Sequence, residues 1–281
     1  MRRRSTPYLL LLPGMAWLGF FFLIPLASLL ATSLQRPLGP STEDGFAPAL
    51  EFTNYSAALL AYWPQFLKSF AFAGLASLIG LLIAFPLAYF IAFRAGRWRM
   101  LMLVLVVLPL FSSFLLRTNA WKTLLSSEGF IVETLNALAL LPDDRVLNTP
   151  IAVIAGLTYN FLPFLVLPIY ASLDRIDKAV VEAAADLYAT AAARLRTVIL
   201  PLAAPGVLSG VLLTFIPAAG DYINAQLLGS IQDKMIGNVI QSQFIIVRDY
   251  PTASALSFMF MVTILVLVLL YIRRVGTREL V

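Results

Sequence analysis

Six long apolar stretches restrict what this chain can fold into. They run approximately over residues 7–34, 69–93, 100–116, 150–173, 204–229 and 253–272. A membrane-spanning helix needs roughly 20 mainly apolar residues. These runs lack the alternation of barrel strands, and open strands would leave backbone groups unsatisfied in lipid, so the stretches predict helices. We therefore expect an all-α polytopic membrane protein, whose six transmembrane helices form a single transmembrane domain over residues 1–281.

Composition agrees with a protein that lies in a bilayer, and it argues against several kinds of chemistry. Hydrophobic residues make up 60% of the chain and charged residues only 12%, whereas a soluble domain carries about a quarter charged residues. Cysteine and histidine are both absent, so disulfides, thiolate nucleophiles and histidine bases are excluded. We expect no catalytic residues, no metal site, no cofactor and no nucleic-acid partner.

The distribution of charge gives an expected orientation. If the N-terminus lies inside, the cytoplasmic segments hold 13 of the 20 Lys and Arg residues, and the outer segments hold nine of the 15 acidic residues. The positive-inside rule then places both termini in the cytoplasm, in a multi-pass protein of the cytoplasmic (inner) membrane. The cytoplasmic basic residues are Arg2, Arg3, Arg4, Arg94, Arg97, Arg99, Arg175, Lys178, Arg194, Arg196, Arg273, Arg274 and Arg278.

A charged, alanine-rich segment interrupts the apolar runs on the expected cytoplasmic side. From Lys178 to Thr197 apolar residues recur at three- and four-residue spacings, which predicts an amphipathic helix that does not cross the membrane. Pro201 and Pro205 are expected to end this helix, because a proline interrupts helical hydrogen bonding. The predicted order is a short helix across the membrane face, a bend, and then the fifth span.

The residues EAAADLYATAAARLRTVILPLAAPG, at positions 182–206, closely resemble the EAA loop of ABC importer permeases. In that family this loop is the coupling helix that docks into a cleft on a cytoplasmic ATPase subunit. The resemblance implies a coupling loop over residues 174–203 and a coupling role for the matching residues. These are Glu182, Ala183, Ala184, Asp186, Leu187, Ala189, Leu200, Pro201, Pro205 and Gly206.

One residue of the loop departs from the family pattern. Tyr188 stands where the family usually has a glycine. That glycine is normally explained by a turn with a positive φ angle, a conformation that disfavours other residues. Either the turn is built differently in this chain, or Tyr188 fills a pocket on the ATPase. The sequence leaves both alternatives open.

Further blocks along the chain make the resemblance more specific. LLRTNAWKTLLSSEGFI, YNFLPFLVLPIYASLDRID, FIPAAGDY and LLGSIQDKMIGNVIQSQF, in this order, are similar to the spermidine/putrescine-type permease subunits. The resemblance implies a type I ABC importer permease fold that moves polyamines by alternating access. It also implies three kinds of partner: a second, related permease, two ATP-binding cassette subunits, and a periplasmic or extracellular solute-binding protein. The sequence contains no G-x-x-x-x-G-K-[ST] phosphate loop, so ATP hydrolysis is expected on a separate subunit.

A polyamine needs carboxylates and aromatic faces along its route, because ammonium groups are attracted to both. Asp221, beside Tyr222 and Asn224 in the outer half of the fifth stretch, is the main candidate. A structural salt bridge or a site at the headgroup level is the alternative for this carboxylate. Tyr159 and Asn160 are further pathway candidates, although both types also serve as hydrogen-bond partners between helices.

Other functions stay open at this point. The solute could instead be an opine, an aminophosphonate, thiamine or iron, since selectivity in this superfamily rests largely on the binding protein. A secondary transporter would need coupling-ion sites within the membrane, where Asp221 stands almost alone. A membrane-embedded enzyme would need paired carboxylates or a nucleophile with its base inside the bundle, and none is evident. Which of two permeases holds the main solute contacts is also open.

Overall fold

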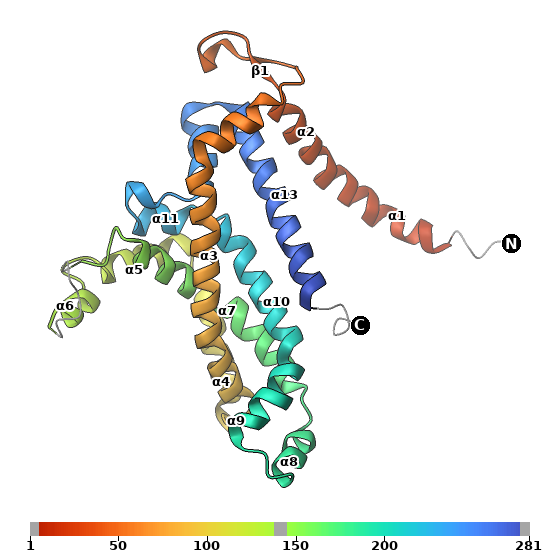
Figure 1. Ribbon diagram of the computed structural model, residues 1–281, viewed down its shortest axis with the longest axis vertical. Helices are drawn as coiled ribbons and strands as arrows, with labels where there is room; N and C mark the ends of the chain where they lie inside the picture. Colours follow the sequence, from red (N-terminus) through yellow and green to blue (C-terminus); the bar gives the residue numbers. More distant parts are fainter. Residues whose placement is uncertain (1–5, 138–144, 276–281) are drawn as a thin grey trace. The chain divides into compact units, whose positions relative to one another are not determined.

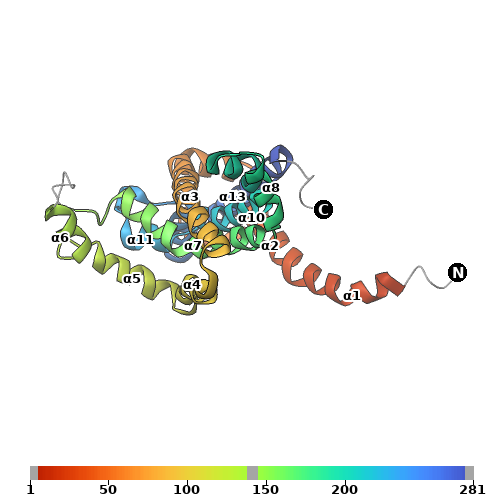
Figure 2. The same cartoon turned by 90° about the horizontal axis from the view of Figure 1, so that it is seen from below.

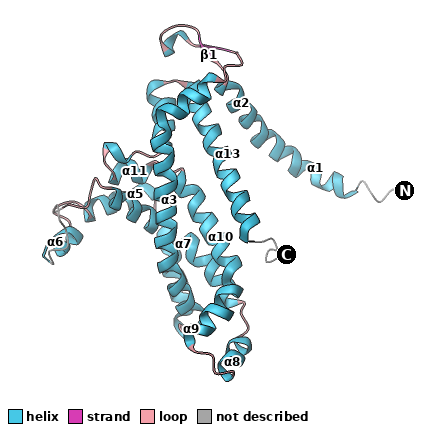
Figure 3. Ribbon diagram, viewed as in Figure 1, coloured by secondary structure: helices cyan, strands magenta, loops and turns pink. Residues whose placement is uncertain are grey.

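Helices account for nearly all of the regular structure in the computed structural model, which describes residues 6–137 and 145–275 (Figures 1 and 3). The expectation of an all-α fold is confirmed. The chain divides into two compact units, one of Met1–Trp63 with Val239–Val266 and the other of Pro64–Asn238 with Leu267–Val281. Arg2, Arg3, Arg4 and Arg278, which contributed to the expected orientation, lie outside the described residues.

The first unit contains the N-terminal helix and most of the C-terminal one. A short antiparallel hairpin pairs Arg36 with Ala47 and Pro37 with Phe46. The Thr42 hydroxyl, in the loop of this hairpin, donates to the Val247 carbonyl over 3.1 Å. The elements are α1 (Thr6–Leu18), the π turn η1 (Gly19–Leu23), α2 (Ile24–Ser33), β1 (Arg36–Pro37), η2 (Thr42–Asp44), β2 (Phe46–Ala47), the π turn η7 (Ser242–Val247) and α13 (Tyr250–Val275).

The second unit holds the central helices and the segment that resembles the EAA loop. Its elements begin in the long helix α3 (Thr53–Phe93), which starts in the first unit, and end in α12 (Ile236–Gln241), which leads back to it. Between them lie η3 (Gly96–Trp98), α4 (Arg99–Val107), η4 (Leu108–Phe111), α5 (Phe114–Leu124), α6 (Phe130–Ala137), α7 (Pro150–Asp174), α8 (Lys178–Asp186), α9 (Ala191–Arg194), the π turn η5 (Leu195–Ile199), α10 (Leu200–Ala219), α11 (Ile223–Leu228) and η6 (Ile231–Asp233).

The described residues contain five helices that are long and apolar enough to cross a membrane. They cover Leu11–Ser33, Thr53–Phe93, Pro150–Asp174, Ala191–Ala219 and Tyr250–Arg273. The stretch expected as a single helix over residues 100–116 is instead bent by 97° between Gly96–Phe111 and Phe114–Leu124. Pro109 is the second residue of the 3₁₀ turn η4 at this bend, and Ser112, with ψ of 154°, is extended. This bent pair is the sixth candidate span.

The predicted helix from Lys178 to Thr197 is wrong, because the structure breaks it between Asp186 and Ala191. The prediction that Pro201 and Pro205 end a helix is also wrong, since Ala191–Ala219 is one continuous span. Pro201 follows the π turn η5, whose wider backbone relieves the clash between a proline ring and the carbonyl four residues earlier, whereas Pro205 lies in the interior of α10. Membrane helices tolerate proline where such adjustments satisfy the freed backbone groups.

Close packing of α7 on α10 fixes the two ends of the segment between them (Figures 1 and 2). Leu165, Ile169 and Leu173 of α7 are fully buried in a core that also contains Ala203 of α10. Gly206 permits the closest approach: a Cβ at this position would lie 2.5 Å from the Pro168 carbonyl oxygen. Any side chain there would push the two helices apart.

Candidate functional site

Helix α8 presents an acidic, solvent-exposed surface. Asp177 caps its N-terminus, where the carboxylate accepts a hydrogen bond from the Ala179 N–H at 2.9 Å. Glu182 and Asp186 are four residues apart and exposed, so their carboxylates lie on one face one turn apart. Glu182 lies beyond the first turn of α8, which contains no acidic residue. The helix dipole therefore does not explain a carboxylate at position 182, because its effect falls off within the first turn.

A left-handed turn ends α8 at Tyr188. The Tyr188 N–H donates to the Ala185 carbonyl at 2.9 Å, and the Ala189 N–H donates to the Ala184 carbonyl at 3.2 Å. These two bonds form a Schellman motif, whose left-handed position is usually a glycine. Tyr188 occupies that position with φ of 59°, so the turn is built as in the family although the residue differs. The left-handed conformation costs a non-glycine residue about 1–2 kcal/mol.

The side chains at this turn point into solvent. Leu187 is 81% exposed and Tyr188 is 96% exposed. Thr190 then starts the next helix, where its hydroxyl accepts a hydrogen bond from the Ala193 N–H at 3.2 Å. We name the exposed residues Glu182, Ala183, Asp186, Leu187 and Tyr188 the α8 tip.

The other residues of the EAA-like pattern lie in different surroundings. Ala184 and Ala189 are half-buried, and Pro201 is exposed at the start of α10. Pro205 is half-buried and Gly206 is buried against α7. Gly206 therefore contributes to helix packing and not to an exposed surface.

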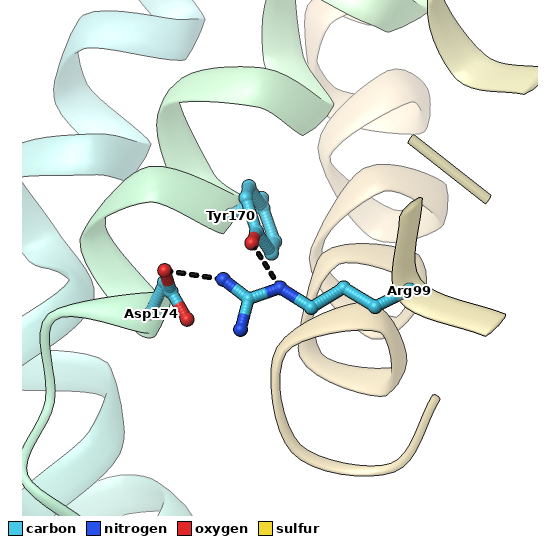
Figure 4. Close-up of polar contacts among 3 residues, drawn as sticks. All are labelled: Arg99, Tyr170 and Asp174. Atoms are coloured by element: carbon cyan, nitrogen blue, oxygen red, sulfur yellow. Dashed lines mark hydrogen bonds and ion pairs between the residues drawn. The ribbon is translucent and has the colours of Figure 1, made fainter. Parts of the chain in front are cut away.

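Three residues that the sequence analysis did not select for a site connect α4 to the end of α7 (Figure 4). The Arg99 Nε donates to the Tyr170 hydroxyl, and an Arg99 amino group forms an ion pair with Asp174. The guanidinium carbon also lies 5.0 Å from the centroid of the Tyr170 ring. Because the side chains of Arg99 and Asp174 are 40% and 38% exposed, water screens the pair and its effect on stability is small. Its effect is positional, since Asp174 is the residue at which α7 ends.

The pathway candidates Asp221, Asn224 and Asn160 meet in a buried polar network. The Asp221 Oδ1 accepts hydrogen bonds from the Asn224 N–H at 2.7 Å and from its Nδ2 at 3.2 Å. The Asn160 Nδ2 donates to the Asn224 Oδ1 at 3.0 Å and to the Thr118 Oγ1 at 3.2 Å. The network thus joins α5, α7 and α11, and Asp221, the most accessible of its four members, is only 9% exposed.

Two features of this network are unusual for buried polar groups. Across residues 6–137 and 145–275 the structure contains one ion pair, between Arg99 and Asp174, so Asp221 has no cationic partner there. The salt-bridge alternative for Asp221 is therefore not supported within these residues. The buried Asn160 Oδ1 also accepts no hydrogen bond within the same ranges. A carboxylate and an amide oxygen in this state would both be stabilised by a hydrogen-bond donor that carries positive charge.

The aromatic candidates Tyr159 and Tyr222 do not join the network. Tyr159 lies beside Trp121, with ring centroids 5.2 Å apart, and both rings line an apolar groove of about 430 Å³ between α3, α5 and α7. Tyr222 is 38% exposed. Its backbone carbonyl accepts a hydrogen bond from the Asn238 Nδ2 at 2.8 Å, which ties α12 to the start of α11.

The structure adds Thr118 and Trp121 to the residues around the candidate pathway. Both lie on α5, which follows the bend in the third apolar stretch. Thr118 is 42 residues from Asn160 in the sequence, and no local pattern indicates that they meet. Trp121 carried a signal, because an aromatic residue close to a predicted span is a candidate to contact a cation.

Comparison with known proteins identifies the group to which this arrangement is similar. The profile of the family described as "Binding-protein-dependent transport system inner membrane component" matches residues 4–275. The spermidine/putrescine transport system permease protein PotB of Haemophilus influenzae is 38% identical over 263 residues, which cover 92% of this chain and 90% of that protein. The Escherichia coli protein of the same name is 34% identical over 261 residues, covering 92% and 93% of the two chains.

Solved structures agree at the level of the fold. A bacterial ABC transporter involved in the import of the acidic polysaccharide alginate matches with a TM-score of 0.69 at 20% identity, covering 96% of this chain and 94% of that one. The MetNI methionine ABC transporter, in inward-facing conformations, matches with a TM-score of 0.53 at 18% identity, covering 74% and 89%. The expected type I importer permease fold is confirmed.

Proposed function

The chain belongs to the family of binding-protein-dependent transport system inner membrane components, and we propose that it moves spermidine and putrescine through the cytoplasmic membrane as one permease subunit of an ATP-driven importer. The observation that carries the choice of solute is the 38% identity to a spermidine/putrescine permease across 92% of the chain. The buried Asp221 without a cationic partner supports a cationic solute independently. Members of this family are permeases and not enzymes, so the energy comes from another subunit.

The α8 tip is the proposed contact to that subunit. It is exposed and carries two carboxylates on one face, and its helix α8 is joined to α7 by Arg175, Ile176 and Asp177. Because α7 and α10 pack closely on both sides of the segment, a displacement of α8 would move these two helices together. In our proposal this movement of α7 and α10 produces alternating access. Asn160 of α7, Asp221 after the end of α10 and Asn224 of α11 line the path of the solute.

The proposed partners are two ATP-binding cassette subunits, a second, related permease and an external solute-binding protein. One structural relative is an alginate transporter in complex with its periplasmic binding protein, which supports the last of these. Large apolar side chains of α1 and η1, such as Trp17, Phe20 and Phe22, are 61–65% exposed. Such a surface fits a position against lipid or against the second permease.

We expect membrane vesicles that contain the complete transporter to accumulate radiolabelled spermidine only when ATP and the solute-binding protein are both supplied. Unlabelled putrescine should compete, whereas thiamine, an aminophosphonate and ferric iron should not. The measurement is initial uptake with each competitor in turn. Competition by thiamine or iron alone would retain the importer and reject the polyamine assignment, and uptake driven by an ion gradient without ATP would reject the importer.

The proposed orientation leads to a separate prediction. Reporter proteins fused at Arg97, Arg194 and Arg278 should give a cytoplasmic signal, and those fused at Glu43, Asp143 and Asp233 an external one, because basic residues concentrate near the first three sites. Paired reporters, one active only inside and one only outside, measure this directly. An external signal at Arg194 would place the α8 tip on the wrong side for an ATPase and overturn the coupling proposal.

A further inference from the structure

We propose that the Tyr188 ring is an anchor that inserts into an apolar recess of the ATPase subunit and so helps select which ATPase this permease accepts. The inference rests on the proposed coupling function of the α8 tip. It goes beyond that function, because the family pattern has a glycine at this position and a glycine offers no side chain to insert.

The backbone at Tyr188 is strained, whereas a glycine in the same conformation would not be. The two hydrogen bonds from the Tyr188 and Ala189 N–H groups hold φ at 59°. For a residue with a Cβ atom, the population of this left-handed conformation is lower by a factor of about 5 to 30 than that of its ordinary backbone conformations. Strained residues of this kind persist where something else compensates, and they cluster at functional sites.

The Tyr188 side chain itself gains no contact within the described residues that would offset the strain. Tyr188 is 96% exposed, and its side chain makes no hydrogen bond or ring contact with residues 6–137 or 145–275. Asn148 and Arg248 also have a positive φ. Asparagine tolerates the left-handed region, and the arginine head group is well solvated. Among these three residues of the described chain, Tyr188 alone holds a large aromatic ring in water.

The residues around Tyr188 indicate the chemistry of the surface that covers its ring. Leu187, which is 81% exposed, adds apolar surface at the neighbouring position, while Glu182 and Asp186 add exposed negative charge on one face of α8. A complementary partner has an apolar recess with cationic side chains at its border. Tyrosine is well suited to such a position, because it buries a large area while only two side-chain torsions are fixed. A subunit that docks on the α8 tip meets these residues first, so we assign the recess to the ATPase.

The absence of cysteine from this chain makes the test direct. In a Tyr188→Cys variant the new thiol is the only one in the permease. We expect a water-soluble maleimide to label it rapidly in membranes stripped of the ATPase, and at least about tenfold more slowly once purified ATPase is added at a concentration high enough to saturate this variant, whose affinity is lowered by loss of the ring. A cysteine at the exposed residue Glu128 is the control, and its labelling rate should not change. Slow labelling before ATPase is added would show that position 188 lies against lipid and would overturn the proposal.

Measuring both the affinity for the ATPase and the stability of the permease shows whether Tyr188 is an anchor or only a strained residue that the fold tolerates. We expect Tyr188→Gly to raise the thermal unfolding temperature of the permease, because it removes strain, and yet to weaken ATPase binding by at least about tenfold. Tyr188→Phe should retain most of the affinity, since it keeps the ring. If Tyr188→Gly binds the ATPase normally, the ring is not an anchor.

A charge reversal at Glu182 distinguishes this failure from a failure of the proposed function. If Glu182→Lys abolishes ATPase binding while Tyr188→Gly does not, the coupling proposal stands and the anchor is rejected. If neither variant changes binding, both are rejected.

Discussion

Replacing Glu182 by lysine should abolish ATP-driven uptake while the protein still accumulates in the membrane at its normal level. Glu182 is exposed in the middle of α8 and its carboxylate forms no ion pair or hydrogen bond with the described residues, so its replacement does not unfold the chain. In our proposal the two carboxylates of α8 meet basic side chains on the ATPase. A lysine at position 182 would place a positive charge against those basic side chains. Like charges brought together in an interface cost several kcal/mol, which is enough to prevent docking.

The measurement is spermidine uptake at matched expression, together with co-purification of the ATPase. Glu182→Gln removes the charge without reversing it and should give an intermediate loss of uptake. Glu128→Lys, which reverses an exposed carboxylate on the outer side of our proposed topology, is the control for charge reversal as such, and it should still bind the ATPase. Uptake at the wild-type rate in Glu182→Lys would remove α8 from the coupling surface.

The helical fold was predictable because run length and lack of alternation identify membrane-spanning helices well. Local breaks were less accessible. Pro109 and the two serines after Phe111 indicate a break in the helix, but the long apolar run around them favoured a single continuous span. The break after Asp186 was hidden because helical periodicity continues on both sides of it. Thr190, a common capping residue, was the available sign.

The error at Pro201 and Pro205 has a specific cause. The rule that proline ends a helix assumes a regular α-helical ladder before it, whereas η5 supplies a wider π turn before Pro201. Pro205 lies in the interior of α10, where a membrane helix tolerates proline if neighbouring groups satisfy the freed carbonyl. A π turn depends on packing, here of α10 on α7, and no sequence rule for single helices anticipates it.

Part of the candidate pathway could be anticipated and part could not. Asp221 and Asn224 are three residues apart, and a carboxylate that accepts from a backbone N–H three positions later is a local pattern. The meeting of Asn160 with Asn224, 64 residues apart, depends on how α7 packs against α11. A single sequence without aligned relatives contains no record of that contact.

The Asp221→Asn variant should reduce spermidine uptake by about tenfold or more while ATPase binding is retained. Asparagine keeps the shape of the side chain and an oxygen that can accept from the Asn224 N–H, so α11 keeps its cap. What is lost is one negative charge in a buried site, and its attraction for an ammonium group is worth roughly 1–3 kcal/mol there. The loss should be larger for a triamine than for a monoamine, because a solute with more positive charges is attracted more strongly by this carboxylate.

Asp233 offers a matched control for the structural part of this effect. It too is a buried carboxylate in a local hydrogen-bonded turn: at the end of η6 it accepts hydrogen bonds from the N-cap residue Ser230, from the N–H at 2.9 Å and from the hydroxyl at 2.6 Å. Because Asp233 is 6% exposed and Asp221 is 9% exposed, an asparagine at either site removes a charge of similar burial. If uptake falls equally in both variants, the loss comes from disturbing a buried, hydrogen-bonded carboxylate and not from a contact with the solute. If it falls only in Asp221→Asn, and falls most for the triamine, then the carboxylate meets the cation during transport, and the unpaired Asn160 Oδ1 is the next group to test.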